Sequence, residues 1–167
     1  MSSNDDYEAL KLENQLCFPL YACSRMVVKM YTPYLKPLGI TYTHYIVLMV
    51  LWEKQSINVG DLGRTLFLDS GTLTPVLKRM ETSGLVTRRR SDDDERSVII
   101  SLTEKGEKLK EKAKDIPSHI GQCLPLPHKK ALELYEDLYA ILNAVSPDRT
   151  CRTRMSCAFS RMPCPHT

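Results

Sequence analysis

The sequence lacks a long hydrophobic run, a secretory signal and any recognisable catalytic motif. Its longest apolar stretch, Tyr45 to Trp52, is far shorter than the eighteen or more residues of a transmembrane helix. Residues 1–6 are polar and acidic, unlike a signal peptide, and we expect them to form a flexible N-terminus. No catalytic triad, glycine-rich phosphate loop or paired carboxylates occur. We therefore predict a cytoplasmic, non-enzymatic protein with no membrane contact, no cofactor and no metal.

The 167 residues, 43% of them hydrophobic, suffice for one domain with a packed core. The six cysteines are therefore not needed as a disulfide framework, and inside a cell they are expected to be reduced. The net charge of +3 does not by itself predict a nucleic-acid partner.

The charge and the cysteines are unevenly placed. Residues 146–167 hold four arginines against one aspartate, together with three of the cysteines and three prolines. The segment has no helical periodicity, and its cysteine spacings do not fit a zinc site. We predict one domain over residues 7–145 and a disordered, basic, cysteine-rich tail over 146–167.

The first half of the chain is predicted to be helical. Residues 7–31 form a first helix, in which Pro19 marks either a kink or the true start near Phe18. Residues 32–39 contain two prolines and a glycine and are expected to be a connection. A second helix follows over residues 42–54. Its apolar face has helical spacing and comprises Tyr42, Tyr45, Ile46, Met49 and Val50.

Two helices and two strands are expected next. Asn58 is a predicted N-cap for a short helix, and Asp69 with Ser70 begins another that ends at Gly84, with Pro75 near its first turn. The second of these helices buries one face and leaves short hydroxyls and long cations on the other. Strands are predicted over 85–90 and 97–102, joined by a charged loop over 91–96. A helix capped by Thr103 to about Ile116 and a last helix over 128–145 complete the chain.

This order predicts a mainly α protein with a small β-hairpin, a winged helix-turn-helix. The polar face of the second helix suits the major groove of DNA, because hydroxyls and cations reach base edges and phosphates there. The tail could then contact the DNA backbone, or a metal, as an alternative to being an inert appendage.

Two segments carry a family resemblance. A close resemblance to the recognition helix and wing of MarR-type repressors lies in residues 69–106, DSGTLTPVLKRMETSGLVTRRRSDDDERSVIISLTEKG. The segments KLENQLCFPLYA (11–22) and ITYTHY (40–45), with Tyr31, are similar to one branch, the organic hydroperoxide regulators called OhrR. The resemblance covers about residues 7–145.

The resemblance implies a repressor that binds a palindromic double-stranded DNA operator as a homodimer. The N- and C-terminal helices would form the dimer. Major-groove contacts would come from Ser70, Thr72, Thr74, Lys78 and Arg79. Arg88 and Arg90 would contact the backbone, and Arg96, oriented by Asp94, would enter the minor groove.

The resemblance also implies a redox switch. Cys17 would react with an organic hydroperoxide, with Tyr31 and Tyr42 hydrogen-bonding its thiolate across the dimer. Cys123 would resolve the oxidised thiol as an intersubunit disulfide, whereas Cys23 is expected to be a buried structural thiol. The expected apolar pocket comprises Leu16, Phe18, Tyr21 and Met49.

Two other functions fit the same residues. A repressor could respond to a reversible phenolic ligand or to a metal, since His119 and Cys123 are four residues apart and His128 follows. A thiol peroxidase could turn over at Cys17. Without a resolving role for Cys123, an external thiol would have to complete the switch.

Overall fold

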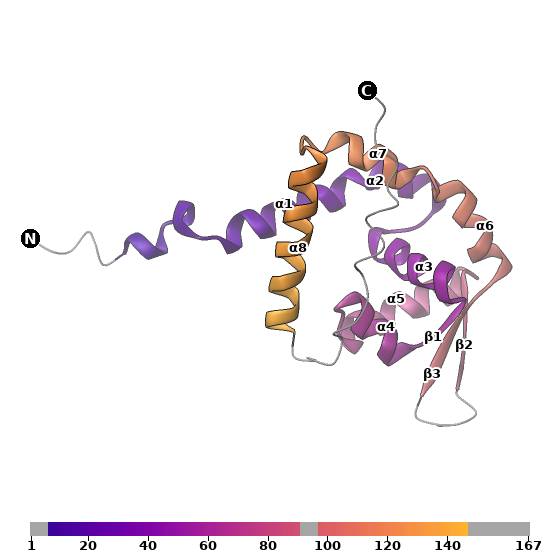
Figure 1. The fold of residues 1–167 in the computed structure, drawn as a ribbon. Coiled ribbons are helices and arrows are strands. Elements are labelled where there is room, and N and C mark those ends of the chain that lie inside the picture. The colour runs from indigo at the N-terminus through magenta and orange to yellow at the C-terminus, as the bar shows by residue number, and fades with distance from the viewer. Residues whose placement is uncertain (1–6, 91–96, 147–167) are drawn as a thin grey trace, which may run out of the picture. The chain divides into compact units, whose positions relative to one another are not determined.

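The computed structural model describes residues 7–90 and 97–146. The chain divides into two compact units, residues 1–42 and residues 43–167, and each is described by itself. Figure 1 labels the α-helices and strands of both units along the chain. The predicted loop over 91–96 and the predicted tail from residue 147 onward lie outside the described residues.

The first unit consists of helical segments. They are the 3₁₀ turns η1 (Glu8–Leu10), η2 (Leu12–Asn14) and η3 (Lys36–Leu38), and the helices α1 (Cys17–Met30) and α2 (Thr32–Leu35). A continuous helix over residues 7–31 is therefore wrong, and the alternative start near Phe18 is confirmed. Pro19 is tolerated because it lies in the first turn of α1, where backbone N–H groups have no intrahelical partner.

The predicted connection over residues 32–39 is also helical in the structure. Pro33 and Pro37 are each the second residue of their helical segment, and so close to its start a proline is accommodated without interrupting the helix. Gly39 then ends the run with a φ of 70°, a conformation that glycine adopts without steric cost.

The second unit combines helices with a small sheet. Starting at Tyr42, the last residue of the first unit, the elements are α3 (Tyr42–Lys54), β1 (Ser56–Asn58), α4 (Val59–Leu66), α5 (Ser70–Thr82), β2 (Val86–Arg90), β3 (Val98–Leu102), α6 (Glu104–Ala113), α7 (Ile116–Cys123) and α8 (His128–Val145). The predicted limits of α3 and α8 are confirmed, and those of the two hairpin strands are correct to one residue. Among the described residues no helix is long and apolar enough to cross a membrane.

Within the described residues the sheet has three antiparallel strands, not the two of the predicted hairpin. Their order is β1-β3-β2, with Ile57 opposite Ile100 and Val86 opposite Leu102. Sequence reasoning missed β1 because three residues give too little alternation to mark a strand. In Figure 1 the β2–β3 hairpin extends beside α4 and α5, the position of a wing next to a helix-turn-helix.

The core of the second unit surrounds α3. Its buried residues are Tyr45, Val47, Leu48, Val50 and Leu51, and they lie on more than one side of the helix. The predicted apolar face was partly wrong, since Met49 is exposed and Ile46 only half-buried. A helix that is apolar nearly all round is buried by neighbours on several sides, so one stripe cannot describe it.

The helix predicted from Thr103 to about Ile116 is α6, which ends at Ala113, and the helix that follows it, α7, was not predicted. Thr103 caps α6 as expected, with its hydroxyl oxygen accepting a hydrogen bond from the Gly106 N–H at 3.0 Å. The helix ends at Ala113, and α7 begins at Ile116 with Pro117 in its first turn. Pro117 therefore begins a new helix and does not simply interrupt the old one.

Candidate functional site

The turn between α4 and α5 brings the backbones of the two helices close together. The Leu68 N–H donates to the Gly63 carbonyl at 2.9 Å, and Phe67 adopts a left-handed φ of 54° to close the turn. A Cβ on Gly63 would lie 2.8 Å from the Leu68 carbonyl oxygen, so this approach requires glycine. Asn58 and Asp69 cap the two helices through their side chains, as predicted.

One face of α5 is anchored in the core and the other is exposed. Leu73, Leu77 and Met80 are buried. The exposed face carries all five side chains that were predicted to read the major groove, Ser70, Thr72, Thr74, Lys78 and Arg79. Pro75 is the sixth residue of α5, so the prediction that it lies near the first turn was wrong. The arrangement exposes hydroxyls and cations, the residue types that contact nucleic acids, on one side of α5.

The arginines of β2 differ in their surroundings. Arg88 is half-buried and its guanidinium lies 3.8 Å from the Glu81 carboxylate of α5, whereas Arg90 is exposed. Arg88 therefore ties the wing to α5, and Arg90 is the more available of the two for a phosphate. Asp94 and Arg96, predicted to act at the tip of the wing, lie outside the described residues.

The pKa of His44, on α3, is affected by a charge on the exposed face of α5. Burial, and then the positive charge of Arg79, lower the pKa of His44 below its usual range. The imidazole is therefore neutral at neutral pH and adds no charge next to α5.

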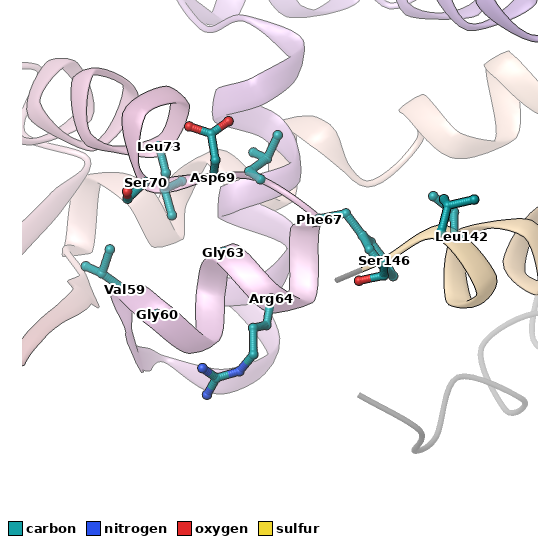
Figure 2. A pocket seen from close by; sticks show the side chains of 12 residues that line it. Val59, Gly60, Gly63, Arg64, Phe67, Asp69, Ser70, Leu73, Leu142 and Ser146 are labelled. Carbon is teal, nitrogen blue, oxygen red and sulfur yellow. The ribbon is translucent and has the colours of Figure 1, made fainter. Parts of the chain in front are cut away.

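A cavity of about 560 Å³ opens at the turn between α4 and α5. Figure 2 shows Phe67, at the end of α4, directed toward Leu142 and Ser146 at the end of α8. Asp69 and Ser70, at the start of α5, also line it. Sequence reasoning missed this site, because nothing in the local pattern pairs a turn near residue 67 with a helix end some seventy-five residues later.

In the first unit, Cys17 is the first residue of α1 and is exposed. The helix N-terminus carries a partial positive charge, which favours a nearby anion. The predicted pocket residues Leu16, Phe18 and Tyr21 are 72%, 45% and 59% exposed. Within a single chain these three side chains do not enclose the thiol; Met49, in the second unit, is exposed as well.

Tyr31 and Tyr42 lie together in the first unit. Their ring centroids are 4.8 Å apart with the planes tilted by 59°. Burial raises the pKa of Tyr42, so its hydroxyl keeps its proton and remains a hydrogen-bond donor. Tyr31 directly follows α1, whose 14 residues begin at Cys17. At 1.5 Å per residue the helix places the thiol about 20 Å from Tyr31 in the same chain.

The other two described cysteines are exposed and reduced. Cys123 is the last residue of α7. Cys23 lies on α1, and the expectation that it is buried is wrong for the single chain. His119 and Cys123 do share α7, but among residues 7–90 and 97–146 no three histidine, cysteine or acidic side chains gather as metal ligands.

Comparisons with known proteins place this geometry among transcriptional regulators. A family model described as transcriptional regulator SarA/Rot matches residues 29–113. The organic hydroperoxide resistance transcriptional regulator of Bacillus subtilis is 52% identical over 139 residues, which cover 83% of this chain and 95% of the relative.

Solved structures agree in fold. Reduced AbfR bound to DNA superposes with a TM-score of 0.69 and 41% identity, covering 85% of this chain and 99% of AbfR. A disulfide form of AbfR superposes with a TM-score of 0.58 and 42% identity, over 84% of this chain and 99% of that one.

Proposed function

The chain belongs to the MarR-like transcriptional regulators, in the branch of the organic hydroperoxide resistance regulators, and we propose that it is a repressor that leaves its operator when an organic hydroperoxide oxidises Cys17. The observation that carries this proposal is that one chain presents a polar, cationic helix face for DNA and an exposed thiol at a helix start.

DNA binding uses α5 and the wing. In a helix-turn-helix the second helix enters the major groove with its N-terminal residues at the base edges, which here are Ser70, Thr72 and Thr74. Lys78 and Arg79, further along the same face, bind phosphates or guanine edges. Arg90 binds the backbone, while Asp94 orients Arg96 toward the minor groove. A homodimer repeats these contacts on a palindromic operator.

The sensing step begins with the Cys17 thiolate. Its sulfur attacks the outer oxygen of the hydroperoxide, an S–O bond forms and the O–O bond breaks. The alkoxide takes up a proton and leaves as an alcohol, and Cys17 becomes a sulfenic acid. In the proposed dimer, the exposed apolar side chains next to the thiol on the same segment, Leu16, Phe18 and Tyr21, favour an organic hydroperoxide over hydrogen peroxide.

The tyrosines that hold the thiolate come from a second copy of the chain. Within one chain α1 separates Cys17 from Tyr31 by about 20 Å, so no hydrogen bond between them is possible there. The Tyr31–Tyr42 pair of a partner subunit would supply the two hydroxyl donors. The sensing site is therefore complete only in the homodimer.

Cys123 completes the switch in this proposal. Its thiolate attacks the Cys17 sulfenic sulfur, a disulfide forms between subunits, and hydroxide leaves and is protonated to water. The exposure of both thiols and the disulfide form of AbfR support this step. The new bond draws the N-terminal helices toward α7, separates the DNA-reading helices and lowers operator affinity.

The decisive experiment is an operator shift assay with cumene hydroperoxide. The wild-type chain is expected to release DNA on oxidation, while Cys17→Ser binds DNA and does not respond. Cys23→Ser is the matched control, since it removes an exposed thiol from the same helix and should leave the response intact. A peroxide response that survives in Cys17→Ser contradicts the mechanism.

Non-reducing gels separate the resolving step from the first oxidation. A dimer-sized band is expected after oxidation of the wild-type chain and not of Cys123→Ser.

The relatives are regulators, which supports a sensor over an enzyme. A sensor consumes about one peroxide per thiol, and sustained turnover with a thioredoxin system would favour a thiol peroxidase.

A further inference from the structure

One side chain connects the wing to the first helix of the helix-turn-helix. In Figure 1 β1 leads directly into α4 beside the β2–β3 hairpin. Asn58 is the last residue of β1 and the N-cap of α4. Its amide oxygen accepts a hydrogen bond from the Gly60 N–H at 2.7 Å, and its amide nitrogen donates to the Ser97 hydroxyl. Both ends of this half-buried amide are therefore engaged, one within α4 and the other just before β3.

The hydrogen bond to Ser97 holds β3 beyond its backbone ladders. Asn58 lies opposite Ile99 in the last β1–β3 pair, and Arg90 lies opposite Val98 in the last β2–β3 pair. Ser97 comes before both paired positions, directly after the predicted loop over 91–96. Within the described part of the chain it belongs to neither ladder. The Asn58 amide thus holds this strand at the described residue nearest the loop.

The other strand of the hairpin contacts the other helix of the helix-turn-helix. Arg88 of β2 lies 3.8 Å from the Glu81 carboxylate of α5. The hairpin therefore has a side-chain contact to α4 through Asn58 and one to α5 through Arg88. The two helices are joined in turn by the hydrogen bond from the Leu68 N–H to the Gly63 carbonyl. The elements proposed to meet DNA are thus connected to one another by contacts outside the sheet.

These two hydrogen bonds give a reason for asparagine at position 58. Asparagine and serine are about equally good N-caps, so the cap alone does not distinguish them. An amide offers an acceptor and a donor on separate atoms, whereas serine has a single hydroxyl on a shorter side chain. A serine at this position could cap α4 but could not reach Ser97 at the same time.

We propose that Asn58 is a positioning residue for DNA binding. Through Ser97 it fixes the wing relative to α4 and α5, so that Arg90 meets a phosphate while α5 lies in the major groove. The proposal rests on the proposed function, because it presupposes a DNA-bound protein. Phosphate contacts fix the register of a protein on the duplex. A wing that swings relative to α5 makes its contact only part of the time and adds less to the affinity.

The test separates positioning from stability. DNA binding is measured by fluorescence anisotropy between about 50 and 200 mM NaCl, on a duplex that the wild-type chain selects from a random-sequence pool. Ser97→Ala removes the hydroxyl and leaves the Asn58 cap in place. The slope of log K against log salt should become shallower by about 0.9 per protomer, the loss of one phosphate contact. Asn58→Ser, which keeps a cap, should have the same effect.

Three further variants identify the cause. Ser97→Thr keeps a hydroxyl at this position and should keep the wild-type slope. Ser101→Ala is the matched control, because it removes a hydroxyl of similar exposure from the same strand, further from the loop, and should leave the slope unchanged. Arg90→Gln added to Ser97→Ala should cause no further loss, since both changes remove the same phosphate contact.

The opposite outcomes reject the positioning role. A wild-type slope in Ser97→Ala with a lower unfolding temperature means that the Asn58–Ser97 bond only stabilises the fold, since a loss of folded protein lowers K alike at every salt concentration. Additive losses from Ser97→Ala and Arg90→Gln, or an equal loss in Ser101→Ala, also contradict it.

The proposed function is tested separately in the same experiment. If the variants keep the wild-type slope and cumene hydroperoxide still releases the duplex, the positioning role fails and the proposed function stands. If the wild-type chain selects no duplex from the pool, the proposed function fails and the positioning role fails with it.

Discussion

Single residues at the interface divide into those that read DNA and those that hold the reading surface in place. Arg88 and Arg90 are two positions apart on β2, and sequence alone treats them alike. The structure separates them, because the Glu81 carboxylate lies 3.8 Å from the Arg88 guanidinium. The position of both arginines on one strand could be predicted from the sequence, but the pairing of Arg88 with Glu81 of α5 could not.

Arg90→Gln should weaken DNA binding without affecting the fold. We expect the slope of log K against log salt to fall by about 0.9 per protomer, since one exposed phosphate contact is lost. Lys112→Gln, which removes an exposed charge from α6, is the control and should behave as the wild type. Thermal unfolding of both variants should match the wild type; an unchanged DNA-binding slope for Arg90→Gln would remove this residue from the interface.

At the scale of elements, the wing and the helix-turn-helix depend on the packing of α6. Gly106 lies in the first turn of α6, where its carbonyl accepts a 3.0 Å hydrogen bond from the Trp52 indole of α3. A Cβ at this position would lie 2.3 Å from the Leu85 carbonyl oxygen. No side chain fits without moving the chain just before β2.

Gly106→Ala should therefore destabilise the protein by about 1–3 kcal/mol, the usual cost of overpacking. Gly121→Ala is the matched control, because it lies within α7 and an added Cβ meets nothing within 4 Å. That change should stabilise the helix by about 0.5–1 kcal/mol. Urea unfolding measures both, and equal effects of the two substitutions would contradict the packing argument.

At the scale of the whole molecule, α8 has more apolar surface than one chain covers. Its exposed apolar residues follow the helical repeat and are Leu134, Leu138, Ile141 and Val145. A second face, which includes Tyr135 and Tyr139, is half-buried. An amphipathic helix with an uncovered row of this kind is typical of an oligomer contact. The homodimer of the proposed function would cover it.

Leu138→Glu/Ile141→Glu should shift the protein from dimer to monomer in sedimentation experiments. Two buried carboxylates would lack partners in such an interface. The free energy needed to bury them unpaired exceeds the stabilisation from the apolar contacts that they replace. Asn143→Glu adds a charge to the same helix outside this row and should leave the dimer intact. If the double variant sediments as the wild type does, α8 does not form the interface through this row.

The local elements of this protein follow from short stretches of its sequence. Spacing and caps at Asn58, Asp69 and Thr103 predicted α4, α5 and the start of α6, because capping and periodicity are properties of neighbouring residues. The polar face of α5 was also predicted correctly from the sequence. Sequence was less reliable where prolines could either start or stop a helix, as in residues 32–39 and 114–123.

The contacts between residues far apart in the chain are visible only in the folded protein. The tertiary structure supplied β1, the burial of α3 on several sides, the Arg88–Glu81 pair and the meeting of the α8 end with the start of α5. It also put Cys17 and Tyr31 at opposite ends of α1, which makes the proposed sensing site a property of two chains. Such relations arise from packing across long sequence separations, where no local pattern constrains them.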